Sequence, residues 1–159
     1  MKKAIVLLMI VVLATSFAIA EDDNNMDAGL RGGLRSGLTG RFWMEDNPIE
    51  ALVTFRGSGL ILTGLYEWHK PLEIGELEGL SWYFGGGAHV GYYSLGDWVI
   101  GGNNDFALGI DGVVGIEYEL EQHINFPLSV SLDYKPGFDI IGGWAGNFGD
   151  AALAVRWDF

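Results

Sequence analysis

Hydrophobic and polar residues alternate along most of the chain, and the last ten residues keep the pattern without a break. Between residues 150 and 159, Leu153 and Val155 fall on one face, whereas Arg156 and Asp158 fall on the other. Because successive side chains of a β-strand point to opposite faces, this segment is predicted to be a strand with one apolar and one polar face. Its length suits a tilted strand that crosses a bilayer.

The same alternation predicts seven further strands, separated by turn residues such as Gly, Ser, Asn, Asp and Pro. Each strand follows the last through a short connection, so neighbours should pair antiparallel. The fold class is therefore all-β: a closed, antiparallel, eight-stranded, up-and-down barrel. The expected strands span residues 27–34, 38–44, 49–56, 60–69, 80–93, 108–120, 127–137 and 150–159.

The segments before the first strand do not fit this pattern. Two lysines, an apolar run and Ala18-Ile19-Ala20 have the order of a secretory leader, and the run is too short to span a membrane. We expect residues 1–20 to be a cleaved signal peptide and 21–26 to be an acidic, mobile segment. The segment 21–26 lacks the full spacing of a calcium loop. The barrel domain is then 27–159.

Alternation alone fits two opposite proteins, because the apolar face could be the core of a soluble barrel or the lipid-facing surface of a membrane barrel. The polar face is rich in glycine and carries the arginines together with acidic residues of the opposite sign. The apolar face carries Trp and Tyr mainly near strand ends, as at a membrane interface. These features favour a polar interior and an apolar, lipid-facing exterior.

Polar-face charges on converging strands predict an internal ion-pair network. Glu50 and Glu67 should lie close together with an arginine, Arg41 or Arg56, between them, because two near carboxylates repel or share a proton. Asp111 should reach Lys135 across two neighbouring strands. We expect this network to be structural and to fill the narrow lumen. Its candidate members are Arg31, Arg41, Glu50, Arg56, Glu67, His89, Asp111, Glu117, Asp133, Lys135 and Arg156.

The terminal strand and the meander resemble known proteins. The Phe159 ending is similar to the terminal strand of outer-membrane proteins, whose final aromatic residue acts as a signal for the barrel-insertion machinery. Stretches such as 65–69, 85–91 and 131–136 resemble the small barrels of the OmpX and OmpA transmembrane-domain type. The resemblance covers the whole chain that follows the expected signal peptide. It implies the outer membrane of a Gram-negative bacterium, and it says little about activity.

Charge and composition narrow the function. The formal net charge is −12, so the chain repels nucleic acid, and it contains no cysteine. The histidines show no metal-ligand spacing, and we expect no metal and no cofactor. Eight strands enclose only enough space for side chains, which argues against a general porin.

The alternatives to a structural barrel are a lipid-modifying enzyme and a soluble secreted β-barrel that binds an apolar ligand. A deacylase of the barrel type needs Ser, His and an acid on the lipid-facing surface, and that face has none of them. A palmitoyl-transferring barrel needs an apolar internal pocket, and the expected interior is charged. We therefore expect a barrel that is not an enzyme.

The connections at one end are predicted to face outward, and the longest of them carry exposed apolar residues that could contact other molecules or lipid headgroups. The candidate contacts are Trp98, Ile100, Trp144 and Phe148. Expected partners are outer-membrane lipids, lipopolysaccharide, and the insertion machinery and periplasmic chaperones during biogenesis. The predicted outward connections are 34–37, 57–59, 94–106 and 138–149, and the inward ones are 45–48, 70–79 and 121–126.

Overall fold

A computed structural model describes residues 26–56, 59–75, 78–92, 106–120, 126–141 and 147–159. Eight strands account for nearly all of these residues. No helix in these ranges is long and apolar enough to cross a membrane. The strands are β1 (Met26–Gly33), β2 (Ser36–Met44), β3 (Asn47–Arg56), β4 (Gly59–Pro71), β5 (Leu80–Tyr92), β6 (Phe106–Glu119), β7 (Leu128–Ile141) and β8 (Asn147–Asp158).

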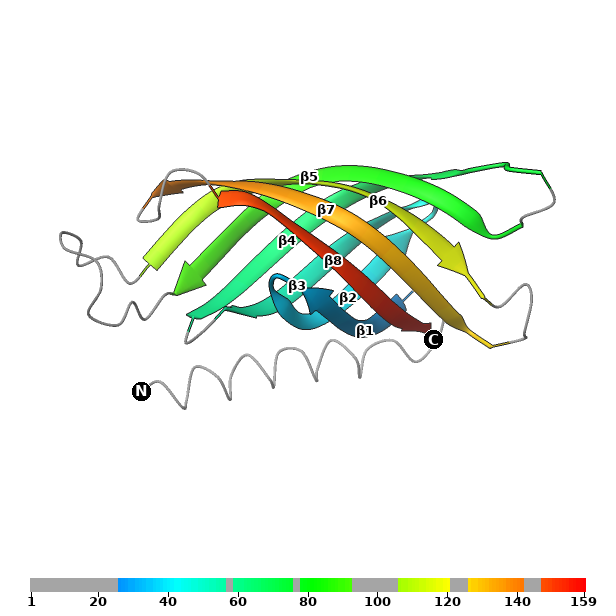
Figure 1. Cartoon of the computed structure of the whole chain (residues 1–159), viewed down its shortest axis with the longest axis horizontal. Coiled ribbons are helices and arrows are strands. Elements are labelled where there is room, and N and C mark those ends of the chain that lie inside the picture. The colour runs from blue at the N-terminus through cyan, green and yellow to red at the C-terminus, as the bar shows by residue number, and fades with distance from the viewer. Residues whose placement is uncertain (1–25, 57–58, 76–77, 93–105, 121–125, 142–146) are drawn as a thin grey trace.

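The strands close into one antiparallel barrel in sequence order, as predicted. Each strand pairs with the next, and β8 pairs with β1 to complete the ring. The amide of Phe159 donates to the carbonyl of Met26 at 3.0 Å, so the last residue is part of this closure. Figure 1 shows the strands crossing the long axis obliquely. We call the end that carries Met26 and Phe159 the terminal end and the opposite end the distal end.

The main departure from the predicted bounds concerns the connection assigned to residues 138–149. β7 continues to Ile141 and β8 starts at Asn147, so that prediction was wrong for most of the connection. The registers of β7 shift between Lys135 and Gly137 on one side and beside Leu108 on the other. Pro136 has no N–H to donate, and prolines inside sheets occur at such bulges. The Pro-Gly pair therefore interrupts the ladder without ending the strand.

Side chains alternate between the two surfaces of the barrel in the predicted sense. Leu132 and Trp157 are exposed on the outside, whereas Arg41, Glu117 and Arg156 are almost fully buried inside. A soluble barrel would show the reverse, with an apolar core and charges in water. The apolar exterior and the polar interior predicted from the sequence are both confirmed.

The lumen also has an apolar wall, which the charge pattern did not reveal. Leu52, Leu65, Tyr83 and Val113 form a buried cluster, and Ile61 is buried on the same side. All five come from β3 to β6, whereas the buried arginines come from β1, β2, β8 and the turn after β1. These aliphatic residues occupy the polar face of strands that also carry Glu50, Glu67 and Glu117, so an apolar cluster lies within the otherwise charged interior.

The glycines on the two surfaces have different roles. A Cβ on Gly115, inside the barrel, would lie 2.5 Å from Cζ of Tyr83 and 2.8 Å from Cβ of Asp133, whereas a Cβ on the outward Gly64 would meet nothing within 4 Å. We expect Gly115→Ala to destabilise the folded barrel by about 1–3 kcal/mol through overpacking. Gly64→Ala, the matched control, should be neutral or stabilising by up to about 1 kcal/mol. Urea unfolding of the two variants checks this, and equal effects would contradict it.

Candidate functional site: the charged lumen

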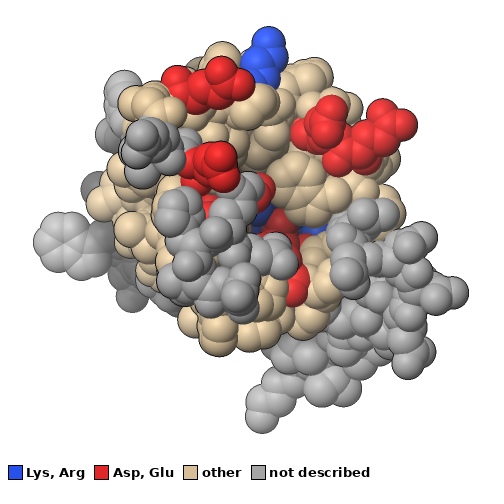
Figure 2. Space-filling view, turned by 90° about the vertical axis from the view of Figure 1, so that its right-hand side faces the viewer, with Lys and Arg blue, Asp and Glu red and all other residues tan. Residues whose placement is uncertain are grey.

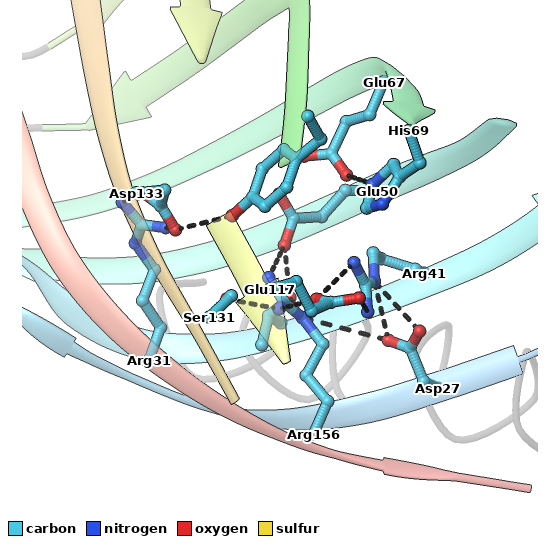
Figure 3. Close-up of polar contacts among 12 residues, drawn as sticks. Asp27, Arg31, Arg41, Glu50, Glu67, His69, Glu117, Ser131, Asp133 and Arg156 are labelled. Atoms are coloured by element: carbon cyan, nitrogen blue, oxygen red, sulfur yellow. Dashed lines mark hydrogen bonds and ion pairs between the residues drawn. The ribbon is translucent and has the colours of Figure 1, made fainter. Parts of the chain in front are cut away.

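Arg156 of β8 is at the centre of the charged network in the lumen (Figure 3). Its Nη2 donates to Oε1 of Glu50 at 2.6 Å, and its Nη1 lies 3.2 Å from Oε2 of Glu117. Nη1 also donates to the hydroxyl of Ser131 at 2.7 Å, and Nε donates to the hydroxyl of Thr39 at 3.1 Å. One guanidinium thus joins residues from four other strands, which its planar fork of five donors makes possible.

Arg41 forms a second centre towards the terminal end. Its Nε donates to both carboxylate oxygens of Asp27, at 2.9 and 3.0 Å, and its Nη1 lies 2.8 Å from Oε2 of Glu117. The indole of Trp43 donates to Asp27 at 2.7 Å and lies under the guanidinium, 4.9 Å from ring centroid to Cζ. Because Glu117 contacts both Arg41 and Arg156, the two arginine centres form one continuous network.

Arg31 of β1 forms a third centre, closer to the distal end than Arg156. Its guanidinium contacts the carboxylate of Asp133 at 2.7 Å through both terminal nitrogens and reaches Asp150 at 3.4 Å. The phenol of Tyr83 donates to Asp133 at 3.2 Å, which links this centre to the apolar cluster of Leu52, Leu65, Tyr83 and Val113. Asp150 also accepts from the backbone amide of Arg35, so it fixes the turn after β1.

The distal part of the lumen contains a histidine between two carboxylates. Nδ1 of His89 lies 2.6 Å from Asp111 and Nε2 lies 2.7 Å from Asp139. Nζ of Lys135 donates to the other oxygen of Asp111 at 2.7 Å, which is the contact between β6 and β7 that the sequence suggested. These four residues come from β5, β6 and β7.

Glu67 and His69 of β4 line the lumen between the arginine centres and the terminal end. Nε2 of His69 lies 3.0 Å from Oε2 of Glu67, and the imidazole stacks on Tyr83 at 4.7 Å between centroids. Trp43 meets the same imidazole edge to face, with the ring centroids 4.9 Å apart. The sequence suggested Arg41 or Arg56 as the partner of Glu50, but the arginine that contacts Glu50 is Arg156. Arg41 pairs with Asp27 and Glu117 instead.

The charges visible at the terminal end are mostly acidic. Figure 2 shows red side chains around the rim and both red and blue atoms within the central hollow. Glu45, Asp46, Glu73 and Glu78 are exposed there, beside a single exposed cation, Lys70, among the described residues of that rim. Inside, acids and arginines alternate closely, so the lumen is filled by paired charges.

Ten of the eleven predicted network residues are buried in the lumen, and the structure brings all ten into ion pairs or hydrogen bonds. The side chains of Arg56 and Phe148 lie outside the described residues, as do Trp98, Ile100 and Trp144, so the predicted loop contacts stay predictions. In the described ranges, no group of three or more His, Asp or Glu side chains could hold a metal ion. The ten are Arg31, Arg41, Glu50, Glu67, His89, Asp111, Glu117, Asp133, Lys135 and Arg156.

Four titratable members of the network were not among the candidates: Asp27, His69, Asp139 and Asp150. Asp27 and Asp150 lie at the start of predicted strands, on the polar face, so the alternation of polar and apolar residues could have identified them. Asp139 follows Pro136 and Gly137, where the strand was expected to have ended, and no local signal marked it. Its place in the lumen depends on the continuation of β7 beyond the bulge.

No protein-family model matches the chain, and no curated protein matches it in sequence. Solved structures do resemble it, among them the following two. The N-terminal β-barrel domain of Pseudomonas aeruginosa OprF superposes with a TM-score of 0.61 at 12% identity, over 86% of this chain and 98% of that domain. Neisserial surface protein A gives a TM-score of 0.51 at 11% identity, over 84% of this chain and 94% of that protein. The chain therefore has the fold of the small, eight-stranded outer-membrane β-barrels.

Proposed function

We propose that the protein is a small integral barrel of a Gram-negative outer membrane, with a structural or surface-interaction role and a lumen closed by side chains. The observation that carries this proposal is the inverted distribution of polarity. Charged side chains converge inside the barrel, and large apolar side chains cover its outside. A contiguous apolar exterior of this extent is costly in water. Only helices and closed barrels satisfy all their backbone groups in lipid.

The aromatic residues on the exterior support the same proposal. On neighbouring strands near the terminal end, Trp68 stacks on Phe84 at 5.5 Å between centroids, and Trp82 stacks on Phe84 at 5.4 Å. Tyr66 meets Trp68 edge to face at 4.9 Å. Such a band of aromatic rings suits the boundary between hydrocarbon and headgroups.

The side chains that occupy the lumen favour a structural role over that of a pore. Arg41 and Arg156 reach carboxylates on strands across the barrel, Arg31 contacts carboxylates on β7 and β8, and each of the three contacts at least two carboxylates. Removing one partner of a buried ion pair leaves an uncompensated charge, so the paired set resists opening. The barrel would act as a rigid anchor that presents its distal connections.

The remaining assignments belong to the same proposal. Residues 1–20 would direct export and be removed, and Phe159 would be read by the insertion machinery, with periplasmic chaperones acting before insertion. Membrane lipids and lipopolysaccharide would surround the apolar exterior. The proposed role requires no enzymatic activity. The two described histidines, His69 and His89, contact carboxylates, and the hydroxyl of Ser131 accepts from Arg156.

Expression in a Gram-negative host tests the proposal. The protein should appear in the outer-membrane fraction, resist extraction by alkaline carbonate and migrate faster on unheated than on heated SDS gels, because a folded membrane barrel is compact. A signal-peptide deletion, residues 2–20, is the matched control and should stay in the cytoplasm unfolded. Release of the full-length protein into the soluble fraction would refute the membrane location. A change in lipid acyl composition on expression would favour the enzyme alternative.

A further inference from the structure

His89 has a carboxylate at each ring nitrogen. Its contacts to Asp111 and Asp139 are 2.6 and 2.7 Å long, and all three residues are buried. A carboxylate only accepts hydrogen bonds, and a neutral imidazole carries only one N–H. Both contacts are therefore hydrogen bonds only when this group holds one proton more than a neutral histidine and two carboxylates.

The surrounding charges indicate where that proton resides. Asp111 also accepts from Lys135 at 2.7 Å, and a carboxylate bound by an ammonium favours its ionised form. Two carboxylates, one ammonium and one imidazolium give a cluster with balanced charge. A neutral imidazole would leave a buried excess of negative charge, which is costly. The ring of His89 is thus the group that carries the additional proton.

The contact between His89 and Asp139 crosses β6 at Gly109, where no side chain fills the space. His89 of β5 pairs with Gly109 of β6, and Gly109 pairs in turn with Asp139 of β7. A Cβ on Gly109 would overlap the imidazole and the carbonyl oxygen of Phe138. The ring therefore lies over the glycine and joins β5 directly to β7.

The ladder around the segment that this contact holds is irregular. On the β8 side, the register of β7 shifts after Lys135, and Gly137 with Asn147 is the last pair among the described residues. On the β6 side, the register shifts beside Gly109. Residues 137–139 and 141 of β7 remain paired with β6, and the Asp139 side chain adds a connection across β6 to His89 in the lumen.

We propose that His89, Asp111 and Asp139 form a proton-dependent tie that fastens the distal end of β7 to the inside of the barrel. When the ring loses its second proton at higher pH, one nitrogen becomes an acceptor facing a carboxylate, and that contact turns repulsive. Asp139 is the partner released, because Asp111 stays bound to Lys135. The Asp139 side chain is also 6% exposed, whereas that of Asp111 is 0% exposed. Thr63, which faces His89 from β4, is uncharged.

Backbone amide exchange of the folded barrel in micelles tests the tie, and this test does not depend on where the protein resides in a cell. In the wild type, protection of residues 137–141 relative to 128–134 should fall roughly tenfold to a hundredfold from neutral to alkaline pH, the range of a charged hydrogen bond. Asp139→Asn is the matched variant. Its amide accepts from an imidazolium and donates to a neutral ring, so its relative protection should not change with pH. Wild-type and variant profiles that run parallel would refute the proposal.

Ring nitrogen NMR gives a second, independent measurement. At neutral pH, both ring nitrogens of His89 should show the shifts of N–H groups, with His89→Gln used to assign the signal. The shifts of a neutral tautomer at neutral pH would overturn the proposal even if Asp139→Asn failed to fold.

Discussion

Replacing Arg156 with methionine is expected to lower the free energy of unfolding of the barrel by about 3–5 kcal/mol, the usual cost of breaking a buried charge pair. Methionine has a similar reach and is apolar, so the loss comes from charge and hydrogen bonding more than from volume. Glu50 and Glu117 would remain buried with fewer cationic contacts, and Thr39 and Ser131 would each lose a bond to the guanidinium. Urea unfolding in phospholipid vesicles, followed by tryptophan fluorescence, measures the change.

Two controls separate this effect from a general loss of charge. Lys70→Met removes a cation from the exposed terminal rim and should cost less than about 1 kcal/mol. Adding Glu50→Gln to Arg156→Met removes one of the stranded carboxylates, so the double variant should be more stable than Arg156→Met alone. If the free energy of unfolding of Arg156→Met lies within about 1 kcal/mol of the wild-type value, the network does not stabilise the barrel as we describe.

Replacing Leu132 with arginine is expected to destabilise the barrel in vesicles by about 2–4 kcal/mol, because this outward position lies within β7, away from both ends of the strand, where a charge would enter the hydrocarbon of the bilayer. The side chain of Leu132 is 54% exposed, so the barrel itself has room for the arginine. Any cost therefore comes from the surrounding lipid. The measurement is the same urea titration in vesicles.

Leu34→Arg is the matched control for lipid exposure. Leu34 is 76% exposed in the turn after β1, at the distal rim, where arginine should cost about 0–1 kcal/mol. If the exterior met water instead of lipid, both substitutions would fall within about 0.5 kcal/mol of the wild type. Equal and small effects at the two positions would therefore contradict the membrane assignment and would leave the fold intact.

Some contacts in the lumen followed from local pattern, and others did not. Asp111 and Lys135 lie on adjacent strands, so parity and hairpin order were enough to suggest their pairing. Arg31 and Asp133 are 102 residues apart, and Arg156 and Glu50 are 106 residues apart. Their contacts depend on how far each strand is staggered against the next around the closed ring. No short stretch of sequence determines the total stagger around the ring.

The apolar wall of the lumen shows the same limit. Leu52 and Ile61 occupy the polar parity, where alternation alone treats an aliphatic residue as an irregularity. Only the closed barrel shows that Leu52 packs with Leu65, Tyr83 and Val113 from neighbouring strands in one buried cluster. The bulge at Pro136 and Gly137 is comparable, because the same dipeptide ends a strand in most contexts and here only bends it.

The sequence by itself determined the strands, their antiparallel order, the closed barrel and the face that turns inward, because the side-chain period of two is a local property that each strand displays independently. Only the tertiary structure decided which charges meet, that Arg156 and not Arg41 contacts Glu50, and that His89 reaches Asp139 over Gly109. Those contacts cross the lumen between strands distant in the chain. Their partners are set by strand stagger, bulges and the space that individual glycines leave.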